Sequence, residues 1–367
     1  MAKGSRRSVF VVAALVVGFA APAQAQEIVP AGGDITLVKS GLNGTVKRNI
    51  RAVARTWGQK VGFNEIFTNA VQATRAFDPL PGEVTGFRWE AGNEGESDWR
   101  PQGITGTADA YASEVTRGRK VLITSWYRRE PNPDHARITL HDTTAANEGA
   151  KYRHVLLVLP GARGNISLAQ THAGGLAWIG NYLYVASTDH LRVFDLRNII
   201  KVKPSKRGDV LTYDYILPQS GSYVAPSNPN FGISSVSLDR SGGQLALVTS
   251  EFKRNASGGR IVRFALNKNG LMGSSRKAAA AFKAEGVVDI QGALMRNGRF
   301  ALTSSYGKGN PSKLYTGARN TRLKVTTWAR DGAEDLFLVP SSNRLYTLTE
   351  FEGSRRVFAV DAGSVGL

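Results

Sequence analysis

Carboxylate side chains recur at matching places in a repeated strand pattern, and they are the first candidates for chemistry. Glu251 and Glu350 lie at the ends of two strands that hold equivalent positions in the repeat. Hydrolysis of a glycosidic bond uses two carboxyl groups about 5–9.5 Å apart, one of which has a raised pKa. We therefore expect these glutamates to face each other, with Asp289 as a third carboxylate candidate. His172 could act as a general base, or it could fix the turn before Gly174 by hydrogen bonding.

A second group of oxygen-bearing side chains suits a hard cation. Calcium takes six to eight oxygen ligands from carboxylates, amides, backbone carbonyls and water. Asp289, Glu334, Asp335 and Asn230 are the candidate ligands, and Ca²⁺ is the one cofactor that the sequence suggests. Their spacing forms no linear calcium loop, and carboxylates in loops also cap turns or remain solvated.

A third group combines amides, aromatic rings and cations in loops. In propellers, the loops that precede the first strands and those that join second to third strands meet around a central channel. The candidate ligand-binding residues in these loops are Gln102, Trp126, Tyr127, Arg128, Arg129, His172, Asn230, Gln291 and Tyr306. This composition favours a sugar as the ligand.

These residues are positioned by a strand pattern that recurs five times between Pro101 and Asp361. A period of about 50 residues is typical of β-propellers. First strands begin near Pro101, His172, Phe231, Ile290 and Ala333, second strands near Val121, Tyr182, Leu245, Arg299 and Arg344, and third strands near Ala136, Leu191, Arg260, Ser312 and Arg355. Fourth strands are less regular and begin near Tyr152, Leu211, Lys277 and Leu323. The sequence predicts an all-β propeller of five four-stranded blades.

The last unit has too little chain left for a fourth strand after Asp361. Residues 83–91 have the length and pattern of the other fourth strands, so we expect them to close the ring by pairing with Arg355–Asp361. Closure would leave no open sheet edge. The propeller domain is thus predicted to span residues 83–367. A sandwich with a second β domain is the alternative.

The N-terminus resembles a secretory signal. Lys3, Arg6 and Arg7 precede an apolar run, and Ala23-Gln24-Ala25 has a small-x-small pattern. Such a segment predicts export with cleavage after Ala25, which makes residues 1–25 a signal peptide and the mature chain secreted. An uncleaved anchor is the alternative, but the run is shorter than the ~20 residues that span a bilayer. No transmembrane segment is predicted in the mature chain.

Residues 26–82 are expected to form a helical strap. Val46, Ile50, Val53 and Trp57 recur at helical spacing, and basic side chains occupy the other face. This amphipathic segment could pack on the propeller or face a membrane or wall.

Composition narrows the chemistry further. The chain has no cysteine, which excludes thiolate catalysis, disulfides and cysteine-ligated metal centres. With 47 basic and 29 acidic side chains the net charge is +18, and it is 44 − 29 = +15 without Lys3, Arg6 and Arg7. A positive field of this size favours polyanionic partners, although it could also serve solubility alone. The basic residues form no stripe interleaved with aromatic residues, so no dedicated nucleic-acid binding is predicted.

The segment from Trp99 through Ile199, with PQGITGTADAY, YRHVLLVLP and HAGGLAWIGNYLYVAST, resembles a group of uncharacterised secreted proteins of high-GC Gram-positive bacteria. The style of the repeat is more distantly similar to olfactomedin-like five-bladed rings and lactonase-like propellers. Neither resemblance implies a known functional residue here, because a fold alone does not define a function.

Two functions follow as expectations. The first is a binding or scaffold module that recognises an anionic glycan or another cell-envelope polymer through the loop face. The second is an extracellular hydrolase of a polysaccharide or ester that uses carboxylates of the central channel, with or without Ca²⁺. The sequence does not decide whether the protein is an enzyme.

Overall fold

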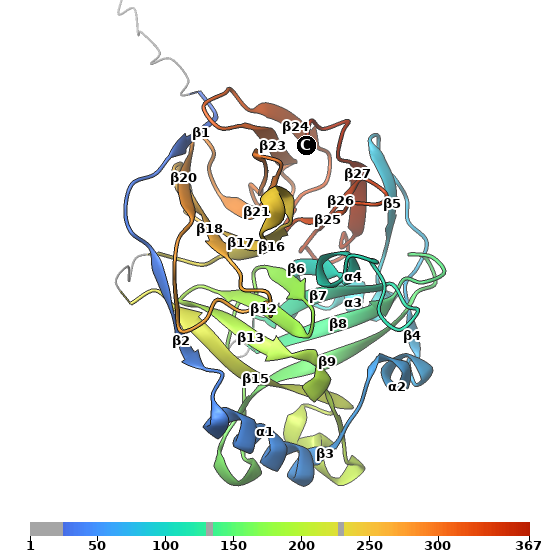
Figure 1. The fold of residues 1–367 in the computed structure, drawn as a ribbon. Coiled ribbons are helices and arrows are strands. Elements are labelled where there is room, and N and C mark those ends of the chain that lie inside the picture. The colour runs from blue at the N-terminus through green and yellow to red at the C-terminus, as the bar shows by residue number, and fades with distance from the viewer. Residues whose placement is uncertain (1–24, 130–134, 227–230) are drawn as a thin grey trace, which may run out of the picture.

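The computed structural model describes residues 25–129, 135–226 and 231–367, which form an all-β structure with a few short helices (Figure 1). The predicted signal peptide, apart from Ala25, and Asn230 lie outside the described residues. Within these three ranges, strand pairing produces four sheets, of which the largest contains 14 strands. No helix among the described residues has the length and apolarity to cross a bilayer.

Five successive groups of antiparallel strands can be traced in the pairing. The first is β6 (Trp99–Gly106), β7 (Val121–Arg128), β8 (Ala136–Asp142) and β9 (Lys151–Pro160). The second is β11 (Leu176–Ile179), β12 (Tyr182–Ser187), β13 (His190–Asp195) and β15 (Tyr215–Val224). The third is β16 (Ser235–Asp239), β17 (Ala246–Ser250), β18 (Gly259–Ala265) and β20 (Ala280–Glu285). The fourth is β21 (Ile290–Arg296), β22 (Arg299–Ser304), β23 (Ser312–Ala318) and β24 (Lys324–Trp328).

The fifth group takes strands from both ends of the chain. It consists of β25 (Phe337–Val339), β26 (Arg344–Leu348), β27 (Val357–Asp361) and β5 (Glu83–Phe87). β5 runs antiparallel to β27, and Phe87 lies opposite Val357. The strand ends at Phe87, so it occupies only the first part of segment 83–91.

The first strands of the groups are packed side by side. β11 contacts β6 on one side and β16 on the other, and β16 contacts β21. Small residues make this approach feasible. A Cβ atom on Gly175 would lie 2.4 Å from the backbone nitrogen of Val236, and one on Gly292 would lie 2.8 Å from the Cα of Asp335. This crowding explains why small residues precede the apolar strands in the repeat.

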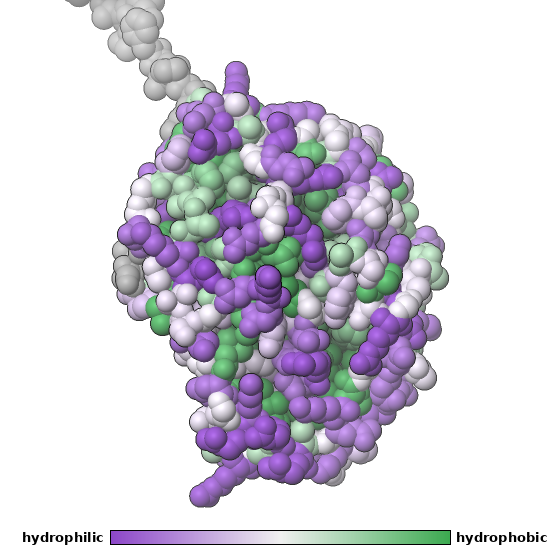
Figure 2. All heavy atoms as spheres, viewed as in Figure 1, coloured by the Kyte–Doolittle hydropathy of each residue, from purple (hydrophilic) through white to green (hydrophobic). Residues whose placement is uncertain are grey.

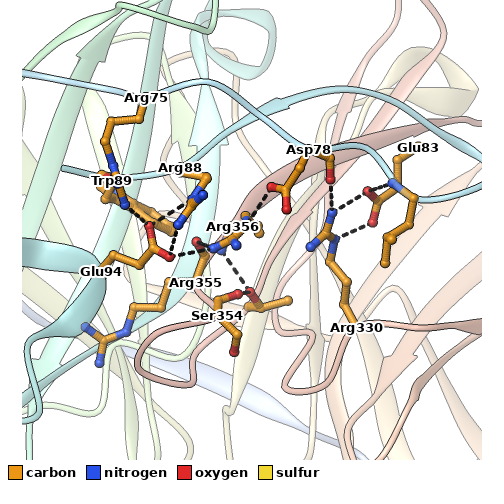
Figure 3. A network of polar contacts seen from close by, with 12 residues as sticks. Arg75, Asp78, Glu83, Arg88, Trp89, Glu94, Arg330, Ser354, Arg355 and Arg356 are labelled. Carbon is orange, nitrogen blue, oxygen red and sulfur yellow. Dashed lines mark hydrogen bonds and ion pairs between the residues drawn. The ribbon is translucent and has the colours of Figure 1, made fainter. Parts of the chain in front are cut away.

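An ion-pair network fixes the start of the ring against its end (Figure 3). The buried Glu94 accepts hydrogen bonds from Arg75, Arg88 and Arg356, the last two at 2.9 and 2.8 Å. Arg356 lies just before β27, whereas Glu94 lies in the short helix α3 (Ala91–Gly95) after β5. We call these four residues the closure network. Near it, Arg330 donates two hydrogen bonds to the carboxylate of Glu83, at 2.5 and 2.7 Å.

Residues 26–82 contain more than the expected helical strap. Two helices are present, α1 (Gly44–Trp57) and α2 (Phe63–Thr68). The segment also holds β1 (Glu27–Pro30), β2 (Thr36–Gly41), β3 (Gly58–Lys60) and β4 (Gln72–Ala73). β1 extends the third group by pairing with β20, and β2 extends the second by pairing with β15. These short strands escape sequence analysis because edge pairing needs backbone groups rather than an alternating pattern.

The remaining elements are short and lie in connections. The strands are β10 (Ile166–Leu168), β14 (Ile200–Val202) and β19 (Ser275–Lys277), and the helix α4 (Thr107–Ala110) follows β6. The 3₁₀ turns are η1 (Ala162–Gly164), η2 (Leu196–Asn198), η3 (Pro204–Val210) and η4 (Ser241–Gly243). β9 pairs with β15 in parallel and so joins the first two groups in one sheet.

Candidate functional site

A cavity of about 380 Å³ lies where the first strands of all five groups meet. Six of the residues selected from the sequence line it: Gln102, Tyr127, His172, Gln291, Glu334 and Glu350. Phe252 and Arg254, from the loop between β17 and β18, line it as well. We call this space the central cavity. Its residues are far apart in the sequence, and the convergence of the strand groups brings them together.

Glu334 lies shortly before β25, and Glu350 follows the end of β26 by two residues. The amide of Glu334 donates to the carbonyl of Leu348 at 3.0 Å, and the amide of Glu350 donates to the carbonyl of Gly332 at 3.0 Å. Residue 334 therefore opposes 348, and residue 350 opposes 332. The two glutamates point to the same face as diagonal neighbours, a relation that puts such pairs about 7–8 Å apart at the backbone.

Glu334 is buried with few polar contacts to offset the loss of water around its carboxyl group. It is 1% exposed, and its Oε1 has no hydrogen-bond partner among the described residues. Burial raises the pKa of Glu334 well above its ordinary value, and the nearby charges of Glu350 and Asp335 raise it further. The positive charge of Arg100 opposes this shift but does not reverse it, so the surroundings of Glu334 favour its protonated form.

Glu350 has better polar contacts than Glu334. The amide of Gln102 donates to its Oε2 at 3.2 Å, and a guanidinium nitrogen of Arg100 lies 3.6 Å from the same oxygen. Burial still raises its pKa, while Arg100 and Gln102 oppose the shift. Because a cation stabilises its carboxylate, Glu350 should lose its proton before Glu334 does.

Aromatic rings form another part of the wall. The rings of Tyr127 and His172 lie 4.1 Å apart between centroids, at an angle of 37°. Burial raises the pKa of Tyr127 to about 12, with a smaller contribution from Glu350. The phenol therefore stays neutral at physiological pH and can donate a hydrogen bond. Two tilted aromatic rings thus lie beside amide and acidic side chains in this wall.

Asp335, the neighbour of Glu334, connects strands next to the central cavity. Its Oδ2 accepts hydrogen bonds from the backbone amides of Ile104 in β6, at 3.1 Å, and Leu176 in β11, at 2.9 Å. One carboxyl oxygen thus links the first strands of three groups. Burial raises the pKa of Asp335 well above its ordinary value.

The expected calcium ligands do not form a cluster. Within the described parts of the chain, no group of three or more acidic or histidine side chains could hold a metal ion. Asp335 uses Oδ2 for backbone amides, and Asp289 accepts a hydrogen bond from the amide of Asn255 at 2.7 Å. Asp289 does not line the central cavity. Asn230 lies outside the described residues.

Two catalytic and binding candidates have structural roles instead. Glu251 receives two hydrogen bonds from the guanidinium of Arg260, at 2.7 and 2.6 Å, and is absent from the wall of the central cavity. Glu251 and Glu350 therefore do not line the central cavity together, whereas Glu334 and Glu350 do. Trp126 is fully buried in the core, with the guanidinium groups of Arg137 and Arg355 4.8 and 5.4 Å from its ring.

The other ligand candidates lie apart from the central cavity. Arg128 forms an ion pair with Asp98 at 3.2 Å and lines a different cavity, next to Arg137. Arg129 is exposed, and its amide donates to the carbonyl of Asp98. The hydroxyl of Tyr306 lies 2.9 Å from that of Tyr315. Arg254, which sequence analysis missed, follows Glu251 by three residues in a loop already suspected of facing the channel.

Comparisons with known proteins identify similar architectures only. No protein-family model matches the chain, and no curated protein matches it in sequence. A GH43_1 enzyme from Xanthomonas citri in complex with xylose has 13% identity and a TM-score of 0.39, covering 85% of this chain and 92% of its own. A gluconolactonase from Xanthomonas campestris has 8% identity and a TM-score of 0.36, covering 79% and 97%. The Cps50 (Swd1) β-propeller domain of Myceliophteria thermophila has 10% identity and a TM-score of 0.33, covering 79% and 99%. All three scores lie below 0.5, so nothing about the activity of this chain follows from them.

Proposed function

We propose that the protein is a five-bladed propeller that hydrolyses an anionic polysaccharide in its central cavity, with Glu334 and Glu350 as the reacting pair. The observation that carries the proposal is the placement of these two glutamates on one face of the β25–β26 hairpin, inside a cavity that all five strand groups build. Each strand group is then one blade.

The two glutamates differ in environment, and this difference assigns their roles. Burial raises the pKa of Glu334 and favours its protonated form, so we assign it as the acid that protonates the oxygen of the leaving sugar. Glu350, next to Arg100, loses its proton first and acts as the base that activates water or as the nucleophile. The base that activates water belongs to an inverting mechanism, and the nucleophile belongs to a retaining mechanism. Each mechanism places two carboxyl groups on opposite sides of the scissile bond, and the two mechanisms differ in the separation of those groups.

The polar wall supplies contacts for sugar hydroxyls. Gln291 offers an amide with donors and an acceptor, and Tyr127 offers a neutral hydroxyl. Gln102 offers its amide oxygen as an acceptor, because its nitrogen already donates to Pro101 and Glu350. The side chain of Arg254 is exposed at the rim and has no ion-pair partner among the described residues. It supplies a cation for a carboxylate or phosphate group on the sugar polymer, in keeping with the chain's net charge of +18.

The test is the release of reducing ends from purified polysaccharides by wild-type protein, Glu334→Gln and Glu350→Gln. We expect either substitution to lower turnover about 10²–10⁴-fold, the usual contribution of one acid or base, without weakening binding. Glu352→Gln is the matched control, because Glu352 lies in the same loop but is exposed. Turnover that survives in both cavity variants would overturn the proposal.

A carboxyl-reduced, neutral form of the same polymer tests the anionic part of the proposal. Arg254→Gln should raise KM for the carboxylated polymer and leave KM for the neutral form unchanged. Equal effects on both polymers would mean that Arg254 recognises no charge.

Binding without hydrolysis is a second candidate, because the side chain of Glu334 is almost inaccessible. A binding module would retain the polysaccharide in a pelleting assay and release no reducing ends. Glu334→Gln would then alter affinity rather than turnover.

We also propose that the protein is exported and that residues 1–25 are removed. The support is the basic and then apolar N-terminal sequence that ends in Ala23-Gln24-Ala25. N-terminal sequencing of protein recovered outside the cell should begin at Gln26. Recovery of the chain only inside the cell, with its N-terminus intact, would rule this out.

A further inference from the structure

A second cavity, of about 460 Å³, lies between helix α1 and the second strand group. It shares no lining residue with the central cavity. One wall is apolar and is formed by Leu42, Val46, Ile50 and Leu271. We call this space the helix cavity.

The helix cavity exists because α1 packs tightly along only part of its length. Toward its end, Val53 and Trp57 are buried, and the indole of Trp57 donates to the carbonyl of Gly164 at 2.7 Å. Toward its start, Val46 is only partly buried and faces the cavity. The strand opposite contributes Ser220, whose small side chain does not fill the space. An apolar surface is thus left open beside a well-anchored helix.

Cationic side chains surround this apolar wall. Lys47, Arg51, Lys60 and Arg197 all line the cavity. Arg197 forms an ion pair with Asp195 at 2.6 Å, and Lys60 donates to Asn198 at 2.6 Å. The side chains of Lys47 and Arg51 are exposed and have no hydrogen-bond or ion-pair partner in the part of the chain that the structure describes. Figure 2 shows hydrophilic residues at the end of the molecule where α1 lies, with hydrophobic residues between them.

We propose that the helix cavity binds a monomeric anionic amphiphile, an alkyl chain with a single carboxylate head like a fatty acid. The apolar wall removes the chain from water, and each methylene buried there adds to the affinity. The positively charged side chains of Lys47 and Arg51 bind the negatively charged carboxylate head. Asp195, the acidic residue lining the cavity, is neutralised by Arg197 and does not repel the head. The proposal is independent of the function of the central cavity.

The test is isothermal titration of the mature protein with decanoate and with octyl glucoside, both below their micellar concentrations. We expect decanoate to bind with one site per chain and octyl glucoside to bind at least about tenfold more weakly, because it has no charge for Lys47 and Arg51. Equal binding of both, or binding of neither, would overturn the proposal. Pelleting with phosphatidylglycerol vesicles without binding of decanoate would also overturn it, since it would indicate a membrane surface.

Matched variants of α1 identify the head-group site. The double variant Lys47→Ala with Arg51→Ala should weaken decanoate binding at least about tenfold, since each charged contact contributes to affinity. Arg48→Ala with Arg55→Ala removes the same charge from the same helix, but neither residue lines the cavity. Decanoate should bind this control like the wild type. Equal loss in both variants would mean that only the overall positive field attracts the ligand.

Discussion

Two buried glutamates, Glu94 in the closure network and Glu334 in the central cavity, have opposite electrostatic surroundings. Glu94 accepts hydrogen bonds from three arginines in the closure network. Burial alone would raise its pKa, but the hydrogen bond from Arg88 and the charge of Arg356 outweigh burial, and the net pKa is lowered. Glu334 in the central cavity is also buried, lacks such partners and has a raised pKa.

The contrast separates a stabilising role from a chemical one. A carboxylate surrounded by guanidinium groups remains charged and holds distant segments together, as Glu94 does for the two ends of the ring (Figure 3). A carboxyl group buried without such partners costs stability, and such groups are enriched at functional sites. This cost at Glu334, whose Oε1 has no hydrogen-bond partner among the described residues, is the physical reason for proposing the central cavity as the site of chemistry.

The largest effect is expected from removing the closure elements altogether. A chain that begins at Trp99 lacks β5 and Glu94, so β27 loses its partner strand and Arg356 its buried counter-ion. We expect this chain not to fold, as judged by far-UV circular dichroism and thermal melting. A chain that begins at Gln26 is the control. Equal melting temperatures for the two chains would show that β5 does not close the ring.

A smaller loss should follow from Glu94→Gln. This change leaves Arg356, which is 8% exposed at its side chain, without its buried partner. Breaking a buried ion pair in this way costs about 3–5 kcal/mol of unfolding free energy. Asp78→Asn is the matched control, because Asp78 also contacts Arg356 but is 67% exposed at its side chain, and it should cost less than about 1 kcal/mol. Denaturant titration of both variants measures the difference, and similar losses would contradict the assigned role of Glu94.

Asp109, in the helix α4 that follows β6, extends the comparison to pH. Burial raises its pKa to about 7, against the hydrogen bond from Thr105 and the charge of Arg240. The ordinary pKa of an aspartate is about 4. When folding raises the pKa to about 7, the stability of the folded state falls as pH rises from about 4 toward 7, because the folded protein binds the proton more tightly than the unfolded chain does. Asp109→Asn should remove this loss and stabilise the protein above pH 7, by at most about 1.4 kcal/mol per unit of pKa shift.

The control for this experiment is Asp209→Asn, which removes an exposed carboxylate. Melting temperatures measured from pH 4 to pH 8 should converge for wild type and Asp109→Asn at the acidic end and diverge at the alkaline end. Parallel curves would show that Asp109 is not held protonated by burial. The lowered pKa of Glu94 predicts the opposite trend, a contribution to stability that is lost as pH falls.

The repeat pattern was sufficient to locate most strands and the face of the site. β20 lies within the irregular segment near Lys277, and residues such as Gln102, His172 and Gln291 line the cavity at the first strands, as the register indicated. Local alternation of apolar and polar residues encodes this information directly. The same signal places Glu334 beside the channel as a candidate metal ligand, whereas we propose it as an acid.

Sequence analysis failed where tertiary partners decide the role of a side chain. Glu251 holds the position equivalent to Glu350, yet Arg260 on the next strand neutralises it. Trp126 seemed to lie in a loop, but β7 continues to Arg128, so the ring still points into the core. Cross-strand pairing and the true ends of strands were not recoverable from residue types alone.

The most direct test of the central claim is the release of reducing ends by Glu334→Gln, compared with Glu352→Gln, on a carboxylated polysaccharide that the wild type binds. The account predicts that Glu334→Gln binds the polymer normally and releases about 10²–10⁴-fold fewer ends than the control. Equal release by the two variants, or no release by the wild type on any polymer that it binds, would contradict a catalytic role for the central cavity.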